Sequence, residues 1–139
     1  MKFLTVSILL ALTLLTGCES ARRADEANKA TLARYTSYAG ESVSQIHRYT
    51  HFDSWTPIDN EHLVVHTNVN QAYLLTLAPP CIDLPFATGL RVKTRFPNVI
   101  EKGFDSIRVG REDCRILDIH TLNYKQMQAD LAAQKKERG

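Results

Sequence analysis

Four of the five histidines form two pairs, and the partners in each pair are four residues apart: His47 with His51, and His62 with His66. Residues four apart lie on one face of a strand or a helix, so each pair can present two imidazoles to one metal ion. Neutral imidazole is a ligand of zinc and copper. The spacing therefore raises a metal-binding hypothesis. The alternative is that these are ordinary surface histidines, because no carboxylate or thiolate stands at metal-motif spacing and His62–His66 lacks the glutamate of a zinc-protease helix.

A basic strip follows one predicted strand, in which Arg91, Lys93 and Arg95 alternate with apolar residues. A period of two places the three cations on one face of that strand. Because guanidinium and ammonium groups suit phosphate, a lipid headgroup or lipopolysaccharide is one expected contact. The alternative is a solvated face that discourages edge pairing. The chain has 17 Lys and Arg against 15 Asp and Glu. This near balance argues against nucleic acid as a partner.

Nucleophilic catalysis has no recognisable arrangement in this sequence, which lacks a Gly-x-Ser-x-Gly turn and a phosphate-binding glycine loop. Aspartates stand near predicted turns, where this residue commonly caps the backbone; they are Asp53, Asp59, Asp83 and Asp105. We therefore predict no catalytic residue and no cofactor, with an enzyme of unrecognised type as an alternative. The aromatic residues Tyr49, Phe52 and Trp55 are expected to close one end of a small β core. The alternative interpretation is that these three residues form an exposed patch that binds a partner.

Cys18 lies directly after an apolar run, Phe3–Leu15, that follows the basic start Met1-Lys2. The run is short of the about 20 apolar residues that span a bilayer and has the length of a secretory signal. Leu15-Thr16-Gly17-Cys18 resembles the lipobox of bacterial lipoproteins, in which the thiol receives a diacylglyceryl group, the chain is cut before the cysteine and the new amine is acylated. The resemblance implies a signal peptide over residues 1–17 and lipidation of Cys18, and such multiple acyl chains anchor stably. A secreted protein and an uncleaved anchor helix are the alternatives.

Glu19 follows the cysteine that the lipobox resemblance implies is acylated. In lipoproteins of this type an aspartate directly after the acylated cysteine favours retention in the inner membrane, and a glutamate there is a weaker retention signal. We therefore expect a lipid-anchored protein in the inner leaflet of the outer membrane, facing the periplasm.

With Cys18 acylated, the other two of the three cysteines, Cys81 and Cys114, are left as one pair. In an oxidising compartment such a pair predicts a structural disulfide. Closing a loop of about 34 residues contributes roughly 3.8 kcal/mol by the chain-entropy relation. A redox pair is the alternative, although neither cysteine has Cys-x-x-Cys spacing, and two metal-ligating thiolates are another.

Hydrophobic periodicity predicts the elements that position these residues. Helices are expected over 19–38, with Arg22–Glu26 and Asp25–Lys29 pairs and a stop at Gly40, and after Asn123, which forms a capping box with Gln126. Strands are expected at 43–49, 63–67, 72–77, 90–96, 106–109 and 114–119, with hairpins over 63–77 and 106–119 and a turn at Trp55-Thr56-Pro57.

These elements predict an α+β, mainly β fold for a chain of 139 residues, which suits one domain. We expect a small antiparallel sheet or partly open barrel of five to six strands, with an N-terminal helix, a C-terminal helix and one disulfide. The expected organisation is a lipoprotein signal peptide at 1–17, a tether and helix at 18–40, an antiparallel β domain at 41–122, and a helix with a basic tail at 123–139.

Six segments of the chain resemble a family of small proteobacterial envelope lipoproteins classified only as a domain of unknown function. They are Tyr35–Gly40, Phe52–Trp55, Asn70–Leu75, Pro80–Ala87, Phe104–Ile107 and Cys114–Ile116. The resemblance spans roughly residues 32–122. It implies a leader, a compact mostly β domain and a cysteine pair matching Cys81 and Cys114, and it implies no known activity.

We therefore expect a non-enzymatic, lipid-anchored envelope protein that faces the periplasm and binds a protein or an envelope component. The alternative from another class is a periplasmic zinc or copper protein that uses His47, His51, His62 and His66.

Overall fold

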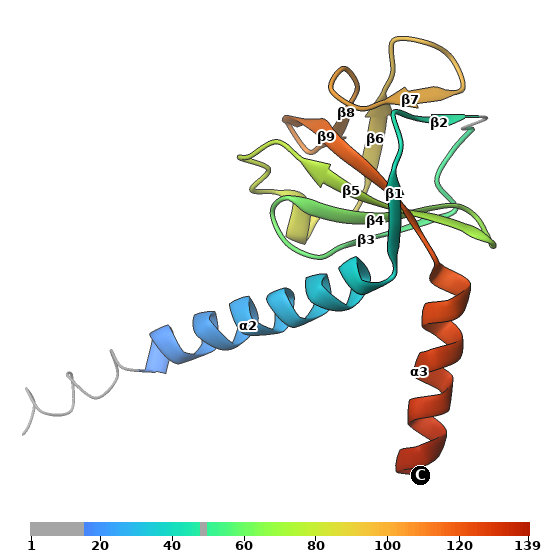
Figure 1. Ribbon diagram of the computed structural model, residues 1–139. Coiled ribbons are helices and arrows are strands. Elements are labelled where there is room, and N and C mark those ends of the chain that lie inside the picture. The colour runs from blue at the N-terminus through green and yellow to red at the C-terminus, as the bar shows by residue number, and fades with distance from the viewer. Residues whose placement is uncertain (1–15, 48–49) are drawn as a thin grey trace, which may run out of the picture. The chain divides into compact units, whose positions relative to one another are not determined.

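The computed structural model describes residues 16–47 and 50–139 of the chain (Figure 1). The chain divides into two compact units, Met1–Thr31 and Leu32–Gly139. Most of helix α2 (Thr16–Ser37) belongs to the first, and it confirms the predicted N-terminal helix. Lys29 pairs with Asp25 at 2.7 Å as predicted, whereas Arg23 rather than Arg22 makes the second four-residue pair, with Glu19.

The expected signal peptide falls mainly on residues 1–15, which lie outside the described residues. Within the described ranges, no helix has the length and apolar character needed to cross a membrane.

The second unit is built on a curled antiparallel sheet, a half-barrel, whose strands lie side by side in the order β3-β4-β5-β9-β8-β6 (Figure 1). In that order the strands span Ser54–Pro57, His62–Asn68, Gln71–Leu77, Glu112–Leu122, Ser106–Val109 and Leu90–Lys93. In addition, β1 (Ala39–Ser42) pairs with β9, and β2 (Gln45–His47) pairs with β7 (Val99–Glu101). The predicted mainly β fold, with an antiparallel sheet or partly open barrel of five to six strands, two helices and one disulfide, is confirmed.

The β4–β5 hairpin, predicted over 63–77, is the most deeply buried part of the sheet. Leu63, Val64 and Val65 have no exposed surface although consecutive side chains point to opposite faces of a strand. Both faces are covered: Leu63 and Val65 belong to the core inside the curled sheet, and Val64 belongs to a second cluster. Residues of the helices and their flanks complete this second cluster; they are Leu32, Tyr35, Tyr38, Ala39 and Tyr124. The continuous apolar run thus reflects burial on two sides.

The C-terminal helix α3 (Tyr124–Arg138) begins where the capping box predicts. The side chain of Asn123 accepts a hydrogen bond from the Gln126 amide at 3.2 Å and so satisfies a free donor of the first turn. Met127, on one side of the helix, is buried. The hydroxyl of Tyr38 donates a hydrogen bond to the carboxylate of Asp130 at 2.7 Å. Tyr35 of α2 and Tyr124 of α3 pack against the second cluster, so the end of α2 and the start of α3 are both held on the β domain.

Near its N-terminus the β domain departs from the prediction. Of the strand expected over 43–49, residues Gln45–His47 form β2 and the chain before them forms β1, while residues 48 and 49 lie outside the described residues. Gly40 was predicted to stop the helix, but α2 ends at Ser37 and Gly40 lies within β1. A Cβ atom on Gly40 would lie 2.5 Å from Thr121 Oγ1, so the close approach of β1 to β9 requires glycine here.

The expected turn at Trp55-Thr56-Pro57 is strand β3, which pairs with β4. A sheet tolerates Pro57 because β3 is an end strand, where the missing amide removes no ladder hydrogen bond.

The strand expected over 90–96 ends at Lys93, and the chain beyond it is organised by Asp105. Asp105 is 1% exposed, and its carboxylate accepts hydrogen bonds from the backbone amides of Arg95 at 3.0 Å and Glu101 at 2.7 Å. These contacts hold the 94–105 loop, within which the short strand β7 was not predicted.

Candidate functional site

Four cations and one carboxylate gather on the outward side of β6, β8 and β9. The strand register places them in two rows that run across β6, β8 and β9. In the first row Arg91 lies opposite Arg108, which lies opposite Asp113. In the second row Lys93 lies opposite Ser106, which lies opposite Arg115. Directly opposed residues in antiparallel strands project from the same face of the sheet. We define the basic face as Arg91, Lys93, Arg108, Asp113 and Arg115, all of which are exposed.

Asp113 forms ion pairs with two of the four cations on the basic face. Arg108 donates to both of its carboxylate oxygens at 2.7 Å, and Lys93 donates at 2.9 Å. The hydrogen bonds from Arg108 first, and then from Lys93, lower the pKa of Asp113 to about 2. This carboxylate therefore stays ionised at any physiological pH and is shared by two cations.

Arg91 and Arg115 have no ion pair or side-chain hydrogen bond with another residue of the described chain. Arg91 and Arg108, facing each other across β6 and β8, line a surface pocket of about 430 Å3 with Gly89, Leu90 and Gly110. Two guanidinium groups directly opposite repel each other unless an anion lies between them or nearby. Arg108 already has Asp113 as its nearby anion, so a phosphate or carboxylate in this pocket would pair chiefly with Arg91.

Arg95 is not part of this face, which corrects the predicted strip of Arg91, Lys93 and Arg95. Since β6 ends at Lys93, alternation no longer governs the direction of Arg95. Its guanidinium pairs with Glu101 at 3.0 Å and lies over the ring of Phe104, 4.0 Å from the ring centre. Continued alternation over 90–96 would also place Phe96 on the apolar side, but Phe96 is 56% exposed.

Arg108 and Arg115 were missed at the sequence level. The signal was present in part, because residues 106–119 were correctly predicted as a hairpin. Alternation within the two arms puts Arg108 and Arg115 on their outward side. The sequence does not reveal that β6 pairs with β8, because the 94–105 loop separates the two strands along the chain.

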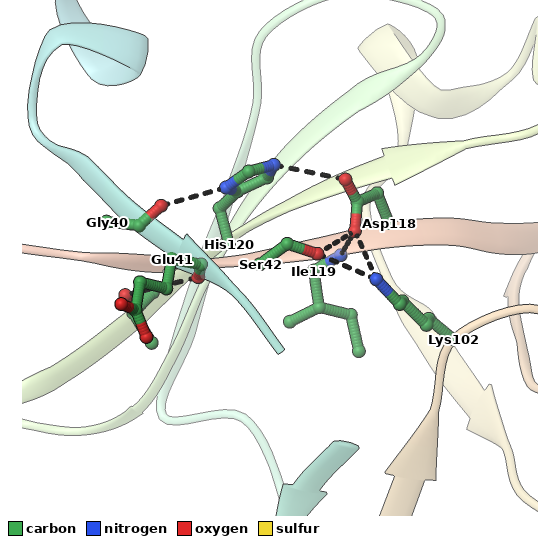
Figure 2. A network of polar contacts seen from close by, with 8 residues as sticks. Gly40, Glu41, Ser42, Lys102, Asp118, Ile119 and His120 are labelled. Carbon is green, nitrogen blue, oxygen red and sulfur yellow. Dashed lines mark hydrogen bonds and ion pairs between the residues drawn. The ribbon is translucent and has the colours of Figure 1, made fainter. Parts of the chain in front are cut away.

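A second polar cluster joins β1, the loop after β7, and β9 (Figure 2). Asp118 is its centre: one oxygen accepts from Ser42 Oγ at 2.5 Å, Lys102 Nζ at 3.0 Å and its neighbouring Ile119 amide at 2.9 Å. The other oxygen contacts His120 Nε2 at 3.0 Å, and the opposite ring nitrogen of His120 contacts the carbonyl oxygen of Gly40 at 2.9 Å. Burial by itself raises the pKa of Asp118, but the hydrogen bonds from Ser42 and Lys102 prevail, and this pKa lies well below its usual range.

Although the cluster contains serine, histidine and aspartate, its order is not that of a hydrolytic triad. In a triad the histidine lies between the serine and the carboxylate and takes the serine proton. Here the carboxylate of Asp118 lies between Ser42 and His120, and its low pKa makes it a weak base. Lys102 donates to Ser42 Oγ at 2.7 Å. The arrangement fastens β1 and the loop after β7 to β9.

The histidine pairs do not converge on a common point in the described structure. His62 and His66 are four residues apart on β4, which separates their backbones by about 13 Å at the rise of an extended strand. His62 Nδ1 contacts Asp59 at 2.9 Å. The ring of His66 packs edge-on against Tyr124, with centroids 4.4 Å apart, and burial lowers its pKa.

His47 is exposed on β2, and His51 contacts Asp53 at 3.2 Å. In the described parts of the chain, one set of three metal-ligand groups lies within 4.8 Å, and it contains no histidine: Cys81, Glu112 and Cys114. Two of its members form a disulfide. Metal binding by the four histidines stays a prediction.

The predicted disulfide between Cys81 and Cys114 is confirmed. Cys81 and Cys114 form a disulfide with a Cα–Cα distance of 5.7 Å, and both residues are buried in the main core. Cys18 is free and exposed on α2. The bridge connects the segment after β5 to β9, two positions separated by 33 in the sequence.

The end strands β3 and β6 contribute to another pocket, of about 380 Å3, lined by His51, Phe52, Trp55, Leu90, Arg91 and Val92. Phe52 and Trp55 are half-buried and pack against the main core, as predicted. Tyr49, the third aromatic residue of that prediction, lies outside the described residues.

A family model described as a family of unknown function, DUF6491, matches residues 1–138 of the chain. No curated protein and no solved structure matches it. These comparisons assign no reaction, ligand or partner to the residues described above.

Proposed function

Because the chain belongs to the DUF6491 family, whose function is unknown, we propose its function from its own residues: a lipid-anchored protein of the cell envelope that faces the periplasm and acts by binding. Residues 1–17 serve as the signal peptide, and Cys18 carries the lipid. Glu19, which replaces the aspartate that retains lipoproteins in the inner membrane, favours the inner leaflet of the outer membrane.

The observation that carries this proposal is the division of the three cysteines. A structural disulfide persists in oxidising compartments outside the cytoplasm, and Cys81 and Cys114 form one in the core. The remaining thiol is exposed, and it lies at the end of the apolar leader in the sequence Leu15-Thr16-Gly17-Cys18. An exported chain with one free cysteine at this place suits lipidation.

Binding rather than catalysis is supported by the Ser42, Asp118 and His120 cluster. A nucleophilic serine needs a base that accepts its proton. The only contacts of Ser42 Oγ among described residues are the weakly basic Asp118 carboxylate and the ammonium of Lys102, which acts as a donor.

The proposal is tested by expressing the full chain with Cys18→Ser in a bacterial host and separating membrane from soluble fractions. We expect the parent chain in the outer-membrane fraction with incorporated fatty acid, and the variant in the soluble fraction without it. Ala21→Ser, a change of similar size three residues away, serves as the control and should behave like the parent. A Cys18→Ser variant that stays with the membranes would contradict the proposed anchor.

A further inference from the structure

We propose that the basic face binds the phosphate groups of an anionic lipid surface. This inference rests on the proposed membrane anchor and adds a second contact between the protein and the membrane. A single cation strip on an end strand is explained by protection against edge pairing. That explanation does not extend to Arg115, because β9 is an interior strand with β5 on one side and β8 on the other. The cations therefore cover a sheet face.

Charge complementarity selects the ligand. The face has four cations and one carboxylate, and Asp113 is already engaged by Lys93 and Arg108. Arg91 and Arg115, one in each row, remain without an acidic partner among the described residues. Planar guanidinium groups with free donors match the oxygens of phosphate.

The pocket beside Arg91 gives one phosphate a defined place. Arg91 and Arg108 approach it from neighbouring strands, and Gly89 and Gly110 line it without side chains. A Cβ atom added to Gly89 would meet nothing within 4 Å, so a small anionic group can enter on that side between the two guanidinium groups, whereas Asp83 Oδ2 lies 3.1 Å from such an atom at Gly110.

Exposed apolar side chains beside the cations favour a lipid surface over an acidic peptide. Leu117 follows Asp113 and Arg115 in the outward alternation of β9 and is 47% exposed. Phe104, which precedes Asp105 in the chain, is 64% exposed, and the guanidinium of Arg95 lies over its ring. Apolar side chains next to lysine and arginine are typical of segments that lie at a membrane interface.

Vesicle flotation tests the proposal with the mature chain from residue 18, carrying Cys18→Ser so that acylation plays no part. The vesicles contain phosphatidylcholine alone or with about one-third phosphatidylglycerol. Each lysine or arginine near an anionic surface strengthens binding about fivefold, so Arg91→Gln with Arg115→Gln should weaken binding to the anionic vesicles about 25-fold. The control, Lys135→Gln with Lys136→Gln on α3, has the same change in net charge and should weaken it less than about threefold.

Selective binding to anionic vesicles that is lost in the basic-face variant and retained in the control supports the proposal. Equal losses in the two double variants, or equal binding to neutral vesicles, would overturn it. Displacement by millimolar inorganic phosphate at constant ionic strength would assign the face to a soluble phosphate, and tighter binding of a polyglutamate peptide would assign it to an acidic protein; both outcomes also overturn it. Because Cys18 is absent, none of these results depends on whether the anchor itself is correct.

Discussion

Asp105 is a buried carboxylate whose replacement should destabilise the loop that leads from β6 to β8. In Asp105→Ala the amides of Arg95 and Glu101 lose their shared acceptor. A hydrogen bond to a charged group contributes about 1.5–3 kcal/mol, so two such bonds give about 3–6 kcal/mol. Burial of the carboxylate already costs part of this gain. We therefore expect a net loss of about 3 kcal/mol in the free energy of unfolding.

The assay is reversible urea and thermal unfolding of the oxidised protein, followed by circular dichroism. For a domain of this size about 4 °C of melting temperature corresponds to 1 kcal/mol, so Asp105→Ala should melt about 12 °C lower. Asp105→Asn should lose about 2 kcal/mol, because its amide keeps one acceptor oxygen and sets an N–H group against the other backbone amide.

Asp83→Ala is the matched control for this prediction. Asp83 is an exposed aspartate at a helical turn, where its side chain makes no capping hydrogen bond. Its replacement should change the stability by less than about 0.5 kcal/mol. If Asp105→Ala were within about 1 kcal/mol of the parent, the argument that the two backbone amides depend on this carboxylate would be refuted.

Three further predictions concern the disulfide, the basic face and strand β1. Replacing both Cys81 and Cys114 by alanine should lower the free energy of unfolding by roughly 3.8 kcal/mol, since the bridge closes a loop of about 34 residues; an unchanged urea midpoint would contradict this. The pKa of Asp113 is lowered from 3.8 to about 2, so its stabilising contribution is complete above pH 4 and is lost as the pH falls toward 2. Acid titration of stability should be flatter in Asp113→Asn over this window, and an identical profile would count against the ion pairs. Gly40→Ala should destabilise by about 1–3 kcal/mol through the clash with Thr121 Oγ1, and Thr121→Ala should recover part of that loss; no recovery in the double variant would show that another contact is responsible.

Local sequence signals predicted the parts of the fold that depend on neighbouring residues. The β4–β5 hairpin has an apolar run on each arm and asparagines at its turn, and the capping interaction of Asn123 with Gln126 spans three residues. Both were predicted. The disulfide was also predicted from the sequence, because the lipobox resemblance assigns Cys18 to a lipid and leaves Cys81 and Cys114 as one pair.

Long-range contacts decided the parts that were not predicted. The alternation of apolar and charged residues over 90–96 continues past Lys93 in the sequence. In the structure, however, the Arg95 amide donates to the Asp105 carboxylate and so does not pair with a neighbouring strand. The basic face depends on the register of β6 with β8, which brings Arg91 opposite Arg108 from 17 residues away. Likewise, Gly40 was interpreted as a helix stop because nothing near it in the sequence reveals that Thr121 lies against it.

The measurement that tests the central claim most directly is the intact mass of the protein isolated from membranes, before and after reduction. The proposal predicts a chain that begins at Cys18 and is heavier than residues 18–139 by the mass of a diacylglyceryl group and an N-linked fatty acid. It also predicts that only reduction allows Cys81 and Cys114 to react with a thiol reagent. A chain that retains residues 1–17 without added lipid, or one whose three thiols all react before reduction, would contradict the claim.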